Sequence, residues 1–380
     1  MRPDDLTFAF SRDKTNFPYL IYNGLSGIQG LSVPSTKSYL DAFVLISFYS
    51  FAFIYLCIVS LLHYHLGFFP RIKDITFQQF CADYLIPYRF SREVLVPLYS
   101  GVCTCKESDI LDYPAGLIVG KFLFLNTLRT TDYIAAVFGT RHYTIASPCG
   151  FKAVVTALTS PVPKNNIHIS TPILRISGRE NEYYLHSSSQ KFGPFNHIIL
   201  ATPTPISSSL ISTLPDPNPA LCNALNKFIF VPSLVITHTD PTFIPTTPSL
   251  HRDLHFSRPS TPAPELQKLD GCTQVTHILH HRSPHLRNTK VYQTTNPYRQ
   301  PREGTVLSQT WFERYLPTLE SLRVRQEVFA KGAWGQGWRG IWFVGSWCGE
   351  GIPLLEGCVE SAENVVEALL SREKGCESSD

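Results

Sequence analysis

The chain of 380 residues has almost no excess of charge of either sign, because 33 Lys and Arg side chains face 30 Asp and Glu side chains. A net charge of +3 indicates neither a nucleic-acid-binding protein nor one that collects acidic partners. The ten cysteines include no paired C-x-x-C spacing, and we expect reduced thiols in an intracellular setting. We assign no metal to the lone C-x-C of Cys103–Cys105. Nor do we assign one to four histidines that lack a nearby cysteine or carboxylate: His277, His280, His281 and His285.

The chain lacks a signal-peptide pattern, because Met1–Asp5 is followed by no apolar core. It contains one long uncharged run, Ala42–Leu62, whose 21 residues as a helix would span a bilayer core of about 30 Å. Three alternatives stay open for this run: a membrane-spanning helix, a helix docked on a membrane surface, and an apolar helix in a soluble core. We therefore expect a membrane-associated protein, or otherwise a cytoplasmic one.

The last part of the chain predicts a strand, a turn and a helix. Ile341–Val344 is a short apolar run typical of a buried parallel strand, and a glycine-rich segment follows it. A helix is predicted from about Leu355 to Leu370, with Val359, Ala362, Val366 and Leu369 on one apolar stripe. The free N–H groups and positive dipole at such a helix start favour an anion or an electron-rich ring edge.

This segment resembles the C-terminal flavin-contacting motif of the FAD-dependent amine oxidase superfamily. Gly345 matches the glycine at the end of the strand, and Leu355-Glu356-Gly357-Cys358-Val359 matches the opening of the helix. The resemblance implies that the helix start lies against the flavin ring and stabilises negative charge there. Ser346 stands where the family often has an acidic residue, which puts one ribityl or phosphate contact in doubt.

Two further segments carry the same resemblance. Asn165–Ser177 alternates apolar residues as a half-buried strand does, and in the superfamily such a strand brings Ile173 to the adenine of FAD. His197–Pro203 resembles the strand that ends in Ala-Thr-Pro beside the cofactor, with Ala201 at the matching position. A helix is expected at Gly150–Thr159, and a hairpin between the two strands at 183–186 and 191–193.

The family begins with a strand, a G-x-G-x-x-G loop that binds pyrophosphate, and a helix. Gly335–Gly340 has this spacing but precedes a strand, so we predict an ordinary loop there. Compared with a complete member, roughly the first hundred residues are missing. We therefore expect an incomplete gene model or a decayed copy rather than a functional short form. The loss would leave the strands at 198–201 and 341–344 with an unpaired neighbour.

Three short segments resemble a narrower branch, the NAD/FAD-binding flavoproteins of bacteria and fungi whose functions are not characterised: Phe10–Lys14, Thr237–Pro241 and Thr294–Tyr298. The expected fold is mixed α/β, with an incomplete Rossmann-like FAD-binding domain interleaved with a substrate domain of helices and mixed sheet. The substrate domain would comprise residues 7–140, including the apolar helix 42–62, and the sheet at 215–320. The FAD domain would comprise 141–210 and 325–371, and 372–380 would be a disordered tail.

The resemblance implies an FAD-dependent oxidoreductase in which hydride passes from substrate to flavin N5. No catalytic residue can be named. A small-molecule substrate is expected, and a lipid-like one would suit an apolar helix at Ala42–Leu62. The alternative is a truncated, non-catalytic and membrane-associated paralogue that no longer binds FAD. A third possibility, an integral membrane binding protein, rests on the apolar run alone. The sequence does not indicate an oligomeric state.

Overall fold

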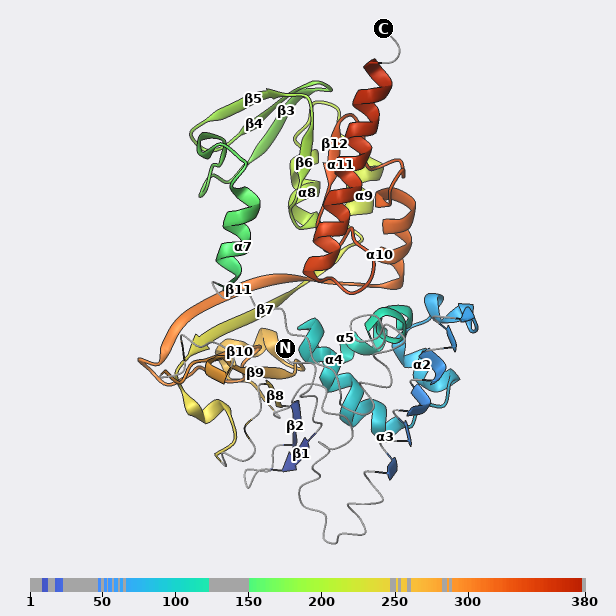
Figure 1. The fold of residues 1–380 in the computed structure, drawn as a ribbon, viewed down its shortest axis with the longest axis vertical. Helices are drawn as coiled ribbons and strands as arrows, with labels where there is room; N and C mark the ends of the chain where they lie inside the picture. Colours follow the sequence, from blue (N-terminus) through green and yellow to red (C-terminus); the bar gives the residue numbers. More distant parts are fainter. Residues whose placement is uncertain are drawn as a thin grey trace. The chain divides into compact units, whose positions relative to one another are not determined.

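A computed structural model describes residues 9–12, 18–22, 66–122, 150–246, 254–257, 261–281 and 289–377, single residues 251 and 286, and short stretches between 47 and 63. The chain divides into two compact units. Unit 1 comprises Met1–His142, Phe228–Arg323 and Glu350–Gly357, and unit 2 comprises Tyr143–Lys227, Val324–Gly349 and Cys358–Asp380. Figure 1 shows the order of the elements.

Unit 1 contains a seven-stranded sheet with the strand order β1-β2-β8-β9-β10-β7-β11. Every strand pairing in it is antiparallel, so the expectation of a mixed sheet was wrong for the described strands. The strands are β1 Ala9–Arg12, β2 Pro18–Tyr22, β7 Ile229–His238, β8 Leu254–Ser257, β9 Gln274–Ile278, β10 Tyr292–Thr295 and β11 Val306–Leu316.

Helices of unit 1 surround an apolar core that includes Phe77, Phe80 and Tyr99. Helix α2 begins with a capping box, in which Thr76 and Gln79 exchange side-chain-to-backbone hydrogen bonds. The α-helices are α2 Phe77–Asp83, α3 Tyr88–Phe90, α4 Val96–Cys103 and α5 Glu107–Asp112. The 3-10 helices are η3 Pro70–Asp74, η7 Pro241–Phe243, η9 Pro264–Leu269 and η10 Leu279–His281, and the π-helices are η4 Ser91–Leu95 and η5 Leu117–Phe122.

The uncharged run Ala42–Leu62 is described in part, and residues 42–46 lie outside the described residues. Its described residues are helical, and Ala52, Leu56 and Val59 are buried in the core of unit 1. The buried hydroxyl of Ser60 donates to the carbonyl oxygen of Val119 at 2.8 Å. Among the residues that the structure describes, no helix has both the length and the apolar character needed to cross a bilayer.

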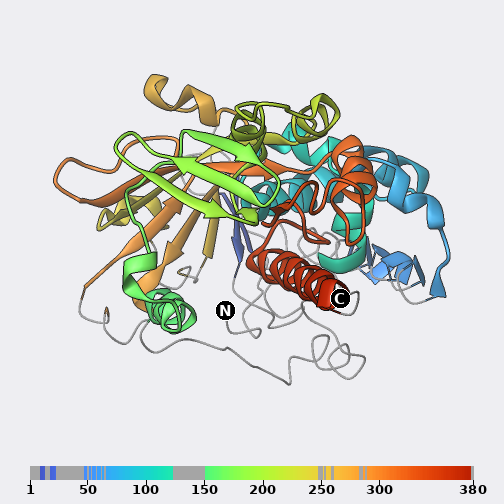
Figure 2. The same cartoon turned by 90° about the horizontal axis from the view of Figure 1, so that it is seen from above.

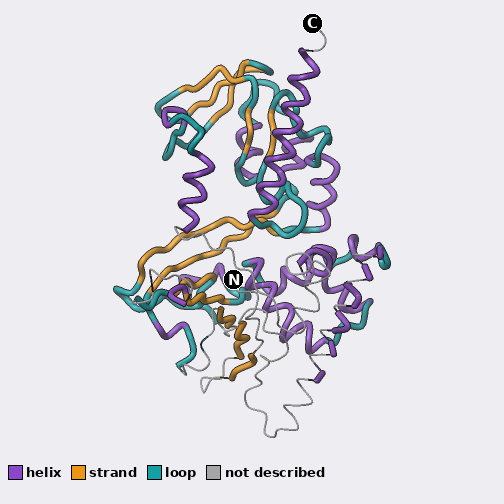
Figure 3. The backbone as a smooth tube through the Cα atoms, in the orientation of Figure 1, coloured by secondary structure: helices purple, strands orange, loops and turns teal. Residues whose placement is uncertain are grey.

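Unit 2 contains a three-stranded antiparallel sheet and a separate pair of parallel strands. Figure 2 shows the three-stranded sheet in light green, and Figure 3 separates strands from helices. The strands are β3 Arg175–Arg179, β4 Glu182–His186, β5 Lys191–Phe195, β6 Ile198–Leu200 and β12 Ile341–Phe343. The helices and turns are α7 Gly150–Thr159, η6 Lys164–Asn166, α8 Thr204–Ile211, α9 Pro219–Leu225 and η12 Arg325–Phe329. Two helices cross the division between the units: α10 Leu319–Val324 belongs to unit 1 except for Val324, and α11 Leu355–Glu377 belongs to unit 2 except for its first three residues.

The predicted helix at Gly150–Thr159 and the predicted hairpin are confirmed as α7 and the β4–β5 pair. The predicted strand at Asn165–Ser177 is wrong except at its last three residues, since β3 begins only at Arg175. Ser170 adopts a left-handed backbone with φ of 55°, which interrupts an extended chain, and Pro172 follows it. Ile169, expected on the buried face, is 82% exposed.

Helix α11 begins at the predicted Leu355 but continues to Glu377, so the prediction of a disordered tail was wrong for residues 372–377, and a different face from the predicted one is buried. Val359 and Val366, which the predicted apolar stripe includes, are exposed, whereas Ser361 and Val365 are buried. The Ser361 hydroxyl accepts the N–H of Gly345 at 3.0 Å and lies 3.2 Å from the carbonyl oxygen of the same residue. This polar anchor sets the rotation of the helix in place of the apolar stripe.

Candidate functional site

The site begins where the two parallel strands of unit 2 end. The N–H of Val344, just beyond β12, donates to the carbonyl oxygen of Leu200 at the end of β6, over 3.1 Å. The indole N–H of Trp347 reaches the carbonyl oxygen of Thr202 at 3.3 Å. The segments containing Ala201 and Gly345-Ser346 therefore lie side by side at the carboxyl ends of β6 and β12. Ligands of open α/β sheets bind at such carboxyl ends.

Gly345 makes the turn that leaves β12. Its φ of 142° is a conformation that residues with a side chain rarely adopt, and an added Cβ would lie 3.2 Å from the Trp347 indole. Trp347 is buried against the rings of Phe329 and Phe343, with centroids 5.1 and 6.2 Å away. The strand-end glycine is thus required by the backbone and by the packed indole beside it.

The remaining residues predicted to contact the cofactor lie on other elements. Ile173 is half-buried in the segment that precedes β3. Leu355, Glu356 and Gly357 form the first turn of α11, where the first two are exposed and the glycine is buried. These three residues belong to unit 1. Unit 2 therefore brings together Ala201, Gly345 and Ser346 from the predicted set.

Helix α8 adds a polar group that sequence reasoning missed. The helix follows β6 directly, and Pro203 at its N-cap offers no side-chain acceptor to the first N–H groups. Thr204, the first helical residue, is fully buried, and its hydroxyl has no hydrogen-bond partner among the described residues. A free hydroxyl at a helix start suits an acceptor oxygen or an anion. The Pro205 at the second helical position was the available signal for this helix start.

The outer edge of β12, away from β6, is closed by a side chain. Gln336 accepts the N–H of Phe343 at 3.0 Å and donates to the carbonyl oxygen of the same residue at 2.8 Å. Its amide also donates to the carbonyl oxygen of Phe329 at 3.1 Å. Gln336 thus supplies both hydrogen bonds that a neighbouring strand would supply. It lies within Gly335–Gly340, which is a loop, as predicted.

The loop after Gly345 contains a thiol that stays protonated. Burial raises the pKa of Cys348 well above its usual range, against the opposing charge of Arg325. Arg325 donates to the carbonyl oxygen of Gly349 at 2.6 Å and so fixes the far end of this loop. Cys348 is therefore a poor nucleophile at neutral pH, since the thiolate is the reactive form.

Unit 1 contains a second polar centre, built from the segments that resemble the narrower flavoprotein branch. The β1–β2–β8 pairings and the β10–β7 pairing place Phe10, His238 and Thr294 in one sheet, while Asp13 and Lys14 lie outside the described residues. His238 Nε2 and the Thr294 hydroxyl are 2.8 Å apart. Burial lowers the pKa of His238, so the imidazole is neutral at neutral pH.

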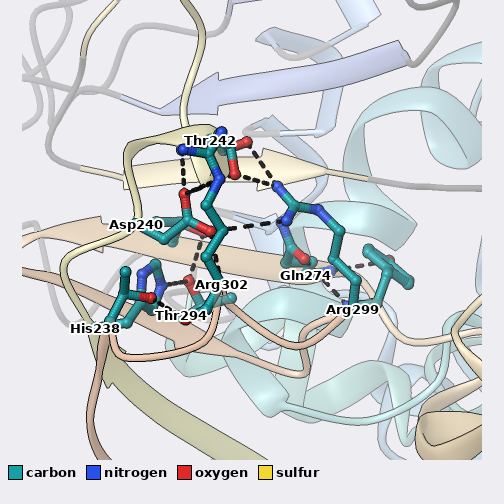
Figure 4. A network of polar contacts seen from close by, with 10 residues as sticks. His238, Asp240, Thr242, Gln274, Thr294, Arg299 and Arg302 are labelled. Carbon is teal, nitrogen blue, oxygen red and sulfur yellow. Dashed lines mark hydrogen bonds and ion pairs between the residues drawn. The ribbon is translucent and has the colours of Figure 1, made fainter.

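Asp240 is the centre of this network and is completely buried (Figure 4). Its carboxylate accepts the N–H and the hydroxyl of Thr242 at 3.0 and 2.8 Å, and the N–H of Arg302 at 3.0 Å. Arg299 and Arg302 place guanidinium nitrogens 3.8 Å from it. Burial alone would raise the pKa of Asp240, but these hydrogen bonds and the Arg299 charge lower it overall. Because both carboxylate oxygens of Asp240 have hydrogen-bond partners, we assign the network a structural role.

No cluster of three metal-ligating side chains occurs among the described residues. His277 lies on β9, His280 and His281 lie on η10, and His285 lies outside the described residues. Burial raises the pKa of Cys103 to about 12 and that of Cys105 well above its usual range. Both thiols are therefore in the form that binds metals poorly.

No protein-family model matches the sequence, and neither does any curated protein. Solved structures do match. A cyclohexylamine oxidase from Brevibacterium oxydans IH-35A gives a TM-score of 0.51 at 8% identity, covering 98% of this chain and 82% of the oxidase. A putrescine oxidase variant with redesigned cofactor binding gives a TM-score of 0.52 at 9% identity, with the same coverage of both chains.

A protein of Exiguobacterium sp. 255-15, provisionally named a protoporphyrinogen oxidase, matches 76% of this chain at 15% identity, with a TM-score of 0.45. This chain spans 66% of the length of that protein. The two amine oxidases establish the class of fold. The chain is a mixed α/β protein whose fold is similar to that of amine oxidases.

Proposed function

We propose that the chain is an FAD-dependent oxidoreductase related to the amine oxidases. When bound, FAD supplies the acceptor for a hydride from the substrate. One observation carries the proposal: Ala201 and Gly345-Ser346 lie side by side at the carboxyl ends of two parallel strands. The fold similarity to two amine oxidases and the sequence resemblance of the same segments support it.

The proposed contacts follow the sequence resemblance. Leu355, Glu356 and Gly357 would place the first turn of α11 at the flavin ring edge, with the N–H groups of the first two residues available to it, while the N–H of Gly357 donates to the carbonyl oxygen of Leu354 at 3.1 Å. Gly345, Ser346 and Ala201 would contact the cofactor with backbone and small side chains, which permit a close approach. Ile173 would pack near the adenine.

The chain's own polar groups fit an oxygen-rich cofactor. The Thr204 hydroxyl is buried without a partner among the described residues, and α8 begins without a side-chain cap. An unpaired buried hydroxyl costs about 1–3 kcal/mol. An acceptor oxygen of the cofactor would remove that cost. Neither this hydroxyl nor any other described group is assigned a catalytic role.

The alternative, a non-catalytic protein that no longer binds FAD, is favoured by a different observation. Gln336 occupies the edge of β12 on which a further parallel strand would pair. In dinucleotide-binding domains the strand before the G-x-G-x-x-G loop lies within the parallel sheet. A strand could join β12 here only by displacing Gln336.

The test is the visible absorption spectrum of the purified 380-residue chain, before and after incubation with FAD and desalting. Retained flavin bands are expected. Their bleaching by an added amine under anaerobic conditions would then identify the substrate class. A chain that stays colourless after incubation, yet gives a cooperative unfolding transition, would overturn the proposal in favour of the non-catalytic alternative.

A further inference from the structure

Several large apolar side chains are exposed on a helix of unit 1 and on the segments bonded to it. The helix in the uncharged run buries Ala52, Leu56 and Val59 but exposes Phe51, Ile54 and Ile58, which recur at helical spacing on another face. Phe51 is 71% exposed. A helix that is apolar all round is normally buried on every side. Among the described residues of this helix, those on one side are exposed instead.

The exposed surface continues beyond this helix. The N–H of Phe68 donates to the carbonyl oxygen of Leu62 at 3.2 Å, which ties the next segment to the helix end. The Tyr55 hydroxyl donates to the carbonyl oxygen of Tyr84 at 2.9 Å, which holds the turn after α2 beside this helix. Leu85 on that turn and Tyr88 beyond it are 82% and 75% exposed.

Backbone geometry marks the same surface. Leu85 and Phe69 have φ of 52° and 62°, the left-handed region that residues other than glycine and asparagine rarely adopt. Both are exposed large apolar residues. Leu85 follows the end of α2, where its N–H donates to the carbonyl oxygen of Ala82 at 3.3 Å and the N–H of Ile86 donates to that of Cys81 at 2.9 Å, the paired bonds of a Schellman motif. The helix end accounts for the backbone of Leu85, but glycine or asparagine is usual at this position, and here a leucine side chain is exposed instead.

The charge around this surface favours an anionic partner. The run 42–62 contains no charged residue, whereas residues 66–92 contain four basic and two acidic ones. The exposed basic residues Arg71, Lys73 and Arg89 lie in the same segments as Phe68 and Leu85, which also contain the exposed acidic residues Asp74 and Asp83, so the excess of basic side chains is small. An apolar surface bordered by basic side chains matches the acyl boundary and anionic headgroups of a bilayer.

We propose that this apolar face, defined by Phe51, Ile54, Ile58, Phe68, Leu85 and Tyr88, docks onto the surface of an anionic lipid bilayer. The helix lies on the bilayer and does not cross it, because its other face packs in the protein core and its Ser60 hydroxyl is bonded to Val119. The proposal does not depend on flavin binding.

Vesicle co-sedimentation of the full chain tests it. Binding is expected to phosphatidylcholine vesicles with about 30% phosphatidylserine, and weaker binding to phosphatidylcholine alone. Lys73→Gln is expected to lower the partition coefficient on the anionic vesicles about fivefold. Leu85→Asn is expected to lower this coefficient at least about tenfold, because the leucine side chain that would enter the bilayer is lost.

Leu85→Asn separates docking from folding, because asparagine tolerates the left-handed backbone and should leave the thermal midpoint unchanged or raised. Ile169→Asn is the matched control: Ile169 is equally exposed at 82% but belongs to unit 2. It should not change vesicle binding. The proposal is overturned if the wild-type chain does not bind anionic vesicles. It is overturned equally if Leu85→Asn binds them as strongly as Ile169→Asn does. It is also overturned if light scattering shows a dimer that Leu85→Asn dissociates while vesicle binding is absent.

Discussion

Gln336 is the side chain whose replacement tests the architecture of unit 2 most directly. Gln336→Met keeps the length of the side chain but removes the amide, and with it three hydrogen bonds to the backbone of Phe343 and Phe329. Each such bond contributes about 1 kcal/mol net. Phe343 is fully buried, so water cannot replace the lost partner. The expected loss in the free energy of unfolding of unit 2 is therefore about 3 kcal/mol.

Intrinsic fluorescence provides the assay, because four of the five tryptophans belong to unit 2: Trp334, Trp338, Trp342 and Trp347. Urea unfolding followed at this signal reports mainly on the unit that contains Gln336. The amide of Phe343 should also lose protection against hydrogen exchange in the variant, because its acceptor has been removed.

Gln190→Met is the matched control, since Gln190 is exposed in unit 2 and only its backbone is hydrogen-bonded. A surface substitution of this kind changes stability by no more than about 0.5 kcal/mol. If Gln336→Met behaves like Gln190→Met, and Phe343 keeps its protection, the amide does not hold the edge of β12. Our reasoning about that edge would then be refuted.

Two further outcomes are expected. Asp240→Asn should destabilise unit 1 by about 2 kcal/mol at neutral pH, because its arginine partners lose their charge partner. Since folding lowers the pKa of Asp240, this advantage of the wild type should shrink as pH falls below the ordinary aspartate value of about 3.9, and urea midpoints from neutral to acidic pH measure it. Thr204→Val should stabilise the FAD-free protein by about 1 kcal/mol, by removing an unpaired buried hydroxyl, while weakening FAD retention. Thermal midpoints with and without FAD give both numbers, and an unchanged retention would exclude Thr204 as a contact.

Local patterns in the sequence were sufficient for several elements. Helix α7 lies at the predicted Gly150–Thr159, and the apolar run at Ile341 forms β12 within one residue of its predicted end. Where prediction failed, a single residue outweighed the pattern. The left-handed backbone of Ser170 interrupts the predicted strand. The hydrogen bond between Ser361 and the backbone of Gly345 determines which face of α11 is buried.

The polar centres could not be predicted, because their partners are distant in sequence. Asp240 and Arg302 are 62 positions apart, and only the pairing of β7 with β10 and β11 brings their segments together. Gln336 is close to Phe343 in sequence, but glutamine has no pattern that marks it as a substitute for a strand. The position of Thr204 at a helix start could have been predicted, since Pro205 indicates that a helix begins immediately after β6.

The division of the chain between its two units has a consequence for how the protein forms. The chain passes from one unit to the other after residues 142, 227, 323, 349 and 357. Ile198 of β6 pairs with Ile341 of β12, so this strand pair can form only after 143 further residues have been synthesised. Such long-range pairing slows folding and prolongs the exposure of apolar segments to chaperones and to aggregation. Neither unit can be excised as one continuous fragment, and a nascent chain that stops before α11 leaves both units unfinished.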